Sequence, residues 1–148
     1  MEMALQKQEQ ILCKALHTDL GKSKTEMMCE IGLVQGEIRW MKQHLGRLCR
    51  TKHVRTPLAQ FAAKSYQSPS PYGNVLIMSP WNYPVLLTLE PLVDAIAAGN
   101  TAVVKPSAYA PASANVLKDL LEECFPPEYV TVVFGGREEN QVLLQEKF

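Results

Sequence analysis

The second half of the chain alternates between short apolar strands and amphipathic helices, and this alternation restricts the fold more than any other feature. Three apolar runs are each followed by a helical pattern after a short connection: residues 74–78, 101–105 and 129–134. Helices are predicted from near Pro84, over 112–124 and over 137–148. Strands linked by helices in this way form parallel sheets with right-handed crossovers. The sequence therefore predicts an α/β fold, with part of a parallel sheet in residues 73–148.

The first of these strands is strongly apolar. Residues Val75 to Met78 include no polar side chain, a pattern typical of a strand that is buried on both faces of a sheet. Pro84 suits the first turn of the following helix, because an amide hydrogen is not needed there.

Residues 1–64 are predicted to form a helical lead-in. A first helix, within residues 4–23, ends at Gly21, which suits the left-handed conformation that often follows a helix. Ser23 and Glu26 have the spacing of a capping box and predict the start of a second helix. Residues 65–72 predict an extended arm or edge strand, since proline is tolerated at sheet edges and not in central strands.

The second helix has apolar residues at alternating steps of four and three. They are Met27, Ile31, Val34, Ile38, Met41, Leu45 and Leu48. This spacing fits the seam of a coiled coil as well as the buried face of an amphipathic helix. Three glycines lie within the seam, which favours one helix packed on its own domain over a dimeric coiled coil.

Composition excludes several classes of function. Fifteen basic residues balance fifteen acidic ones, so no overall charge favours nucleic acid or an acidic membrane surface as a partner. The sequence shows no signal peptide pattern and no apolar run as long as a membrane span. Its four cysteines lack the spacing of a zinc or redox site, so we expect no metal. Free, partly buried thiols in a cytoplasmic protein are the natural interpretation.

Ligands of parallel α/β sheets bind beyond the carboxyl ends of the strands. Asn82 follows the first strand, where its amide could stabilise an oxyanion or cap the next helix, and the residues alone favour neither role. Lys105 ends the second strand and could bind ribose or phosphate, or reach solvent. Gly135 and Gly136 follow the third strand, where they allow close approach of a ligand or form a turn. No glycine-rich phosphate loop motif is present.

The stretch "PYGNVLIMSPWNYPVLLTLEPLVDAIAAGNTAVVKPS" resembles the cofactor domain of NAD(P)-dependent aldehyde dehydrogenases, most closely the class 3 branch. "EIGLVQGEIRWMKQHLGRL" and "TPLAQFAAKSY" resemble the helical lead-in and arm of the same branch. The resemblance implies a Rossmann-like fold, NAD or NADP as cofactor and oxidation of an aldehyde to a carboxylic acid. It also implies a homodimer joined through the arm.

The resemblance further implies roles for individual residues. Asn82 matches the asparagine that stabilises the oxyanion formed when a cysteine thiolate attacks the aldehyde. We expect the other positions that match the family to contact the cofactor: Met78, Ser79, Pro80, Trp81, Lys105 and Ser107. Gly135, in the glycine turn after the third strand, is also expected to contact it. Lys105 is the expected partner of the adenosine ribose, with Ser107 beside it.

Two features depart from the family pattern. The family usually continues K-P-S-E, whereas Ala108 stands in the fourth position, so we expect weaker preference for NAD and easier acceptance of NADP. The segments with the nucleophilic cysteine and the general-base glutamate are not found among the 148 residues. We therefore expect the N-terminal part of an aldehyde dehydrogenase, inactive and poorly soluble alone. The alternative is a non-catalytic fragment or interaction module that associates through its helix seam and arm, or complements a second polypeptide.

Overall fold

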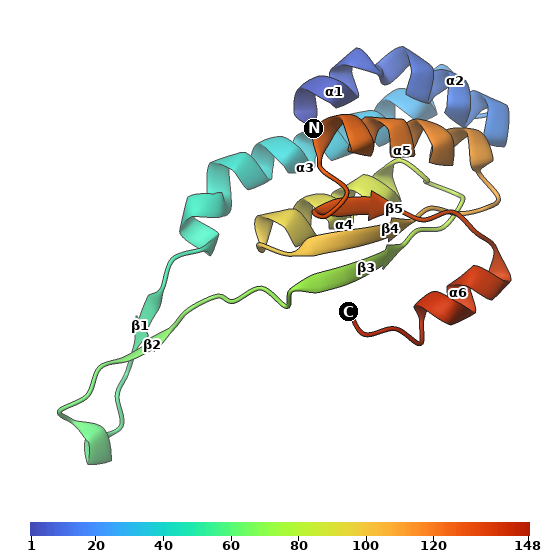
Figure 1. Ribbon diagram of the computed structural model, residues 1–148. Coiled ribbons are helices and arrows are strands. Elements are labelled where there is room, and N and C mark those ends of the chain that lie inside the picture. Colours follow the sequence, from blue (N-terminus) through green and yellow to red (C-terminus); the bar gives the residue numbers. More distant parts are fainter.

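The computed structural model describes residues 1–148 as a helix-covered sheet from which a narrow arm projects (Figure 1). Its helices are α1 (Glu2–Lys7), α2 (Glu9–Leu20), α3 (Lys24–Leu48), α4 (Leu86–Ala97), α5 (Pro111–Cys124) and α6 (Arg137–Leu143). Its strands are β1 (Lys52–Val54), β2 (Ser65–Gln67), β3 (Asn74–Met78), β4 (Thr101–Lys105) and β5 (Val130–Val132).

Strands β3, β4 and β5 form a parallel sheet in that order. Asn74 lies opposite Thr101, and Ala102 lies opposite Val130, so the three carboxyl ends meet at one edge. The helices α4 and α5 connect successive strands. This arrangement confirms the predicted α/β fold with a partial parallel sheet.

Only one face of this sheet is covered. Ile77, Val104 and Val130 are buried in the core that also includes side chains of α4 and α5. On the other face Met78 is 36% exposed, and Leu76 is only partly buried. The expectation of a first strand buried on both faces is therefore wrong for this chain, because no helix of the structure packs on the second face.

The predicted first helix is divided into α1 and α2 at Gln8, whose φ of −97° and ψ of 6° depart from helical values. The bend directs Leu5 and Leu12 into one core and leaves Ile11 exposed. Gly21 ends α2 with a φ of 63°, as the sequence predicts.

Helix α3 begins as its capping box predicts and packs on its own domain. The Ser23 backbone N–H donates to Glu26 Oε2 at 2.8 Å, and the Glu26 N–H donates to Ser23 Oγ at 3.4 Å. The first half of the seam is buried against α4, while Leu45 and Leu48 remain exposed. The interpretation of a helix packed on its own domain is confirmed for this first half of the seam.

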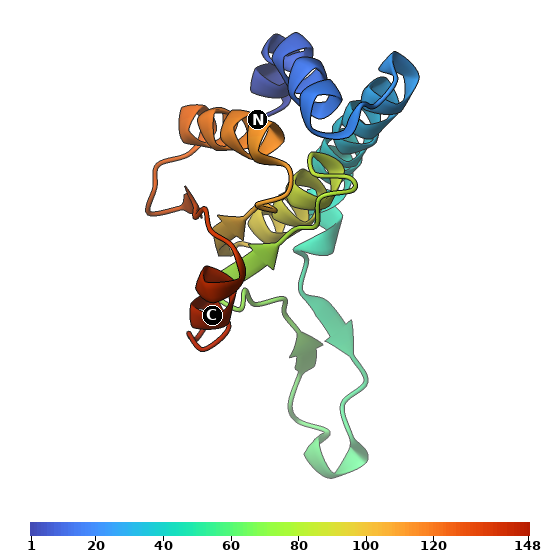
Figure 2. The same cartoon turned by 90° about the vertical axis from the view of Figure 1, so that its right-hand side faces the viewer.

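The arm is a β-hairpin rather than the end of a helical lead-in. Strands β1 and β2 pair antiparallel, with His53 opposite Tyr66, and a short 3₁₀ helix (Leu58–Gln60) lies near the tip. Both ribbon views show the hairpin projecting away from the body (Figures 1 and 2). The expectation of helix up to residue 64 is wrong beyond Leu48, because residues 50–55 have no apolar face to pack and pair with β2 instead.

All four cysteines are free, but Cys29 and Cys49 are exposed rather than partly buried. Cys13 and Cys124 are half-buried, and burial raises the pKa of the Cys13 thiol. No helix in the structure is both long and apolar enough to cross a membrane. No group of three or more His, Cys, Asp or Glu side chains is placed to hold a metal ion.

Candidate functional site

Two adjoining cavities lie at the carboxyl ends of β3, β4 and β5. Their volumes are about 380 Å³ and about 690 Å³, and we call them the first and the second cavity. Ser107, Ala108 and Gly136 line both of them, so the two cavities meet along the turns that follow β4 and β5. The site therefore occupies the edge of the sheet that the sequence predicts.

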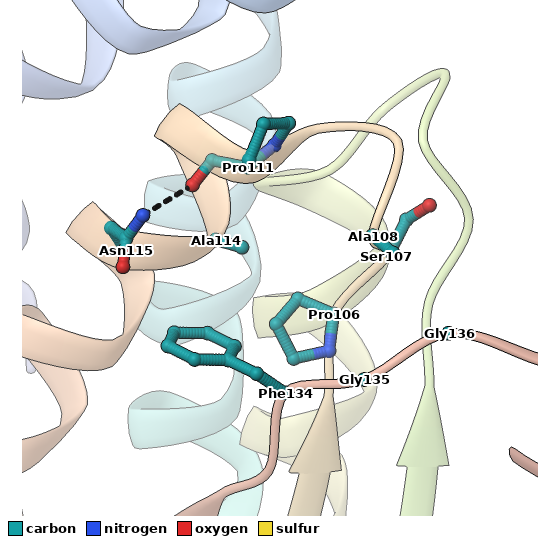
Figure 3. Close-up of a pocket in the computed structure, with 9 residues that line it drawn as sticks. All are labelled: Pro106, Ser107, Ala108, Pro111, Ala114, Asn115, Phe134, Gly135 and Gly136. Carbon is teal, nitrogen blue, oxygen red and sulfur yellow. Dashed lines mark hydrogen bonds between the residues drawn. The ribbon is translucent and has the colours of Figure 1, made fainter. Parts of the chain in front are cut away.

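The first cavity has mostly apolar walls (Figure 3). The Phe134 ring from the end of β5 faces Pro106 on one side, and the first turns of α5 contribute Pro111 and Ala114. Asn115 is held at the rim because its Nδ2 donates to the Pro111 carbonyl at 2.8 Å. Flat apolar surfaces with few polar groups are typical of sites that bind a planar ring.

The second cavity is more polar. Lys105 is 4% exposed, and its Nζ donates to the Pro106 carbonyl at 3.1 Å. Burial lowers the pKa of Lys105, an effect that the nearby Glu139 carboxylate partly offsets. Asn140 also lines the cavity, and its buried Oδ1 has no hydrogen-bond partner. The cavity thus contains the Lys105 ammonium, which has only one hydrogen-bond acceptor, and the Asn140 Oδ1 atom, which has no donor.

Gly135 is required where β5 leads into α6. Its φ is 154°, and a Cβ at this position would lie 2.4 Å from Glu139 Cγ. Glu139 Oε2 accepts the Gly136 N–H at 2.6 Å. Hydrogen bonds from the backbone N–H groups of Glu139 and Gly136 lower the pKa of the Glu139 carboxyl. The glycine therefore lets this carboxylate fold back and cap α6 beside the cavities.

The loop between β3 and α4 is fixed at its base. Ser79 N–H donates to the Lys105 carbonyl at 3.2 Å, which extends the sheet by one bond. The Ser79 and Thr88 hydroxyls are hydrogen-bonded at 2.6 Å, and both residues are buried. Met78, Ser79 and Pro80 all line the second cavity.

Asn82 lies at the exposed crest of this loop. Its side chain makes no hydrogen bond within the chain, and α4 has no side-chain cap of its own. The first N–H groups of α4, those of Val85 and Leu86, donate instead to the carboxylate of Glu30 on α3. The alternative in which Asn82 caps the helix is therefore wrong, and its amide is free for another partner.

The structure brings together most of the predicted site residues. Five of them line the second cavity: Met78, Ser79, Pro80, Lys105 and Ser107. Ser107 and Gly135 line the first cavity. Trp81 and Asn82 line neither, and both are exposed on the crest of the loop.

Sequence reasoning missed Phe134, Arg137, Asn140 and the buried Glu30. Phe134 and Arg137 flank the glycine pair that follows a strand, and Asn140 lies one turn further along α6. A position just beyond a strand end is a usable signal for residues near a ligand. Glu30 lies three residues after Met27 and four before Val34, on the seam side of its helix. A carboxylate at such a position indicates a buried partner.

Comparisons with known proteins give a consistent result. Residues 1–147 match the family model described as "Aldehyde dehydrogenase family". The chain is 45% identical to the 4,4'-diaponeurosporen-aldehyde dehydrogenase of Staphylococcus aureus, over all of this chain and 32% of that protein. It is 38% identical to aldehyde dehydrogenase family 3 member A2 of Rattus norvegicus, over 97% of this chain and 30% of that protein.

A solved structure described as the substrate-bound state of Staphylococcus aureus AldH superposes with a TM-score of 0.95 and 44% identity. The match covers 98% of this chain and 32% of that chain. The chain thus spans about a third of the length of the relatives that it matches. A family match over nearly every residue, with the class 3 resemblance confirmed by these relatives, shows that the chain belongs to the aldehyde dehydrogenase family.

Proposed function

We propose that residues 1–148 form the N-terminal, cofactor-binding part of an NAD(P)-dependent aldehyde dehydrogenase that oxidises aldehydes to carboxylic acids. The observation that carries the proposal is the pair of adjoining cavities at three parallel strand ends, beside a free asparagine amide. When bound, NAD(P) supplies the hydride acceptor for this oxidation.

The residues present fit a dinucleotide. In the second cavity Lys105 has one backbone acceptor and can donate its remaining N–H groups to ribose hydroxyls. The unsatisfied Oδ1 of Asn140 is a complementary acceptor for a hydroxyl. The apolar walls of the first cavity suit a purine ring. Met78 to Trp81 would lie along the cofactor, and Gly135 would allow its close approach.

In this proposal Asn82 donates its side-chain N–H to the oxyanion that develops on the aldehyde oxygen. A preorganised donor of this kind contributes on the order of 3 kcal/mol to lowering a barrier. None of the four cysteines lines either cavity. We assign the nucleophilic thiolate and the general base to residues outside these 148, so the chain alone is expected to be inactive.

Ala108 is the residue that bears on the choice of cofactor. It lines both cavities, so no carboxylate is present there to accept a ribose hydroxyl or to repel a 2′-phosphate. Arg137 lines the second cavity as well and adds positive charge. We propose that the site accepts NADP at least as readily as NAD.

The test compares binding of NADP⁺ and NAD⁺ to the purified chain by isothermal titration calorimetry. We expect Ala108→Glu to weaken NADP⁺ binding relative to NAD⁺ by about tenfold, because like charges brought together oppose binding. Ala108→Gln fills the same space without charge and serves as the matched control. An unchanged ratio of affinities in the glutamate variant contradicts the cofactor proposal. Production of NAD(P)H from an aliphatic aldehyde by the chain alone contradicts the proposal that the nucleophile and the general base lie outside these 148 residues.

A second candidate function is association, favoured by the arm. Leu58 and Phe61 near its tip are 86% and 84% exposed, so together they offer apolar surface that a partner could cover. We propose that the hairpin joins two copies in a homodimer. We also propose a cytoplasmic location, in which the four thiols stay reduced.

A further inference from the structure

A buried carboxylate outside the two cavities holds the start of α4. The side chain of Glu30 on α3 is 0% exposed. Its Oε1 accepts the Val85 N–H at 2.8 Å and the Leu86 N–H at 3.1 Å. Its Oε2 accepts the Lys22 ammonium at 2.5 Å. A carboxylate withdrawn from water requires such partners, and here all of them belong to one junction.

The same junction holds the residue next to Asn82. Lys22 Nζ lies 4.0 Å from the centroid of the Tyr83 ring, a cation–π contact. The Tyr83 carbonyl accepts the Leu87 N–H at 2.9 Å. Glu30 and Lys22 thus fasten the backbone and side chain immediately after Asn82.

The other end of the loop is fastened separately. The Ser79–Thr88 hydrogen bond closes its base, and Ser79 is also tied to the backbone of β4. Between the two fastenings, Trp81 and Asn82 make no side-chain hydrogen bond and are exposed. The backbone on both sides of Asn82 is therefore held while its amide is left free.

We propose that Glu30 is a positioning residue for Asn82: through the N-terminus of α4 and with Lys22, it fixes the loop that presents the amide. This inference rests on the proposed oxyanion role of Asn82, which requires a preorganised donor. Glu30 contacts neither cavity and acts only through the loop.

The structure offers a matched control at the next helix. Asp19 on α2 accepts the Ala112 N–H at 3.1 Å and the Ser113 N–H at 2.7 Å, so it holds the start of α5 in the same way. Loss of either carboxylate leaves two helical N–H groups without partners. Only Glu30 is connected to the loop that bears Asn82.

The experiment measures amide hydrogen exchange of the full chain in Glu30→Ala and Asp19→Ala. In Glu30→Ala we expect exchange of the N–H groups of residues 85–87, where the loop enters α4, to rise by about tenfold or more, with a smaller change at 112–114, because buried N–H groups lose their acceptor. In Asp19→Ala we expect the reverse pattern at a comparable loss of stability. Glu30→Gln keeps a carbonyl oxygen and is expected to restore much of the protection. Asn82→Ala should leave exchange unchanged.

Uniform exchange increases in both alanine variants overturn the inference, since they show that Glu30 supports only global stability. Where an alanine variant shows no cooperative unfolding, Glu30→Gln and Asp19→Asn are compared instead, and each is expected to give a smaller rise in exchange at its own helix start, because the amide keeps one acceptor oxygen but loses the charge. The readout does not depend on dehydrogenase chemistry. If protection of the loop depends on Glu30 but the chain binds neither NADP⁺ nor NAD⁺, the inference that Glu30 fixes the loop still stands. The proposed function is then overturned instead.

Discussion

At the scale of single residues, Lys105 illustrates a conflict between binding and stability. Its ammonium is buried at the end of β4 with a single backbone acceptor, and burial lowers its pKa below the ordinary 10.5. Between the lowered pKa and 10.5 the unfolded chain binds more protons than the folded chain, so stability rises with pH in that window. Below the lowered pKa the full cost of burying the charge is present.

We therefore expect Lys105→Met to raise the free energy of unfolding at pH 7 by about 1 kcal/mol while abolishing measurable cofactor binding. The gain should shrink as the pH approaches 10.5. Urea denaturation at several pH values and calorimetric titration with NADP⁺ measure the two effects. Lys14 is exposed and its ammonium has no partner, so Lys14→Met should change neither quantity. A destabilised Lys105→Met chain would contradict this account.

At the scale of elements, the turn from β5 into α6 depends on one glycine more than on its neighbour. A Cβ at Gly135 would meet Glu139 at 2.4 Å, whereas a Cβ at Gly136 would meet the same side chain only at 3.8 Å. The φ of Gly136 is −102°, so this residue lacks the positive φ that Gly135 adopts.

We expect Gly135→Ala to displace Glu139, unfasten α6 and weaken NADP⁺ binding by about tenfold or more, because strain at positive φ adds to the clash. Gly136→Ala should weaken NADP⁺ binding less, because its Cβ would meet no atom closer than 3.8 Å. Binding titrations, with circular dichroism to follow helix content, compare the two variants. Equal behaviour of both alanines would show that this turn tolerates side chains at either position.

Local signals account for what the sequence predicts well about these elements. The strands, Gly21 and the Ser23–Glu26 box depend on neighbouring residues, and the edge of the sheet follows from the parallel order. The carboxylate hydrogen bonds that cap α4 and α5 could not be predicted from local sequence. Glu30 and Val85 are 55 positions apart, and Asp19 and Ala112 are 93 positions apart. The role of Asn82 as a cap fails for the same reason: a distant carboxylate already occupies that place.

At the scale of the whole molecule, the apolar tip of the arm lies far from the body of the chain (Figure 2). The sheet also has unpaired edges at β3 and β5, which can pair with other chains. Both features favour association, and their effects can be separated by substitution at the tip.

We expect the double variant Leu58→Ser with Phe61→Ser to shift the chain toward smaller species, because exposed apolar area drives association. Sedimentation velocity measures the distribution of species. Tyr72 is 95% exposed but lies outside the hairpin, so Tyr72→Ser is the matched control. If both variants sediment alike, association proceeds through the sheet edges rather than the arm.

The packing of α1 and α2 on α5 has a consequence for the order of events during synthesis. Lys7 forms an ion pair with Glu123, which is synthesised 116 positions later. Asp19 accepts a hydrogen bond from the Ala112 N–H, which is also synthesised much later. Because α5 closes the core over these first helices, a ribosome must deliver most of the chain before their apolar faces are covered. Helices α1 and α2 therefore emerge first but are among the last elements to have their apolar faces covered. We expect a chaperone to bind this part of the nascent chain for longest.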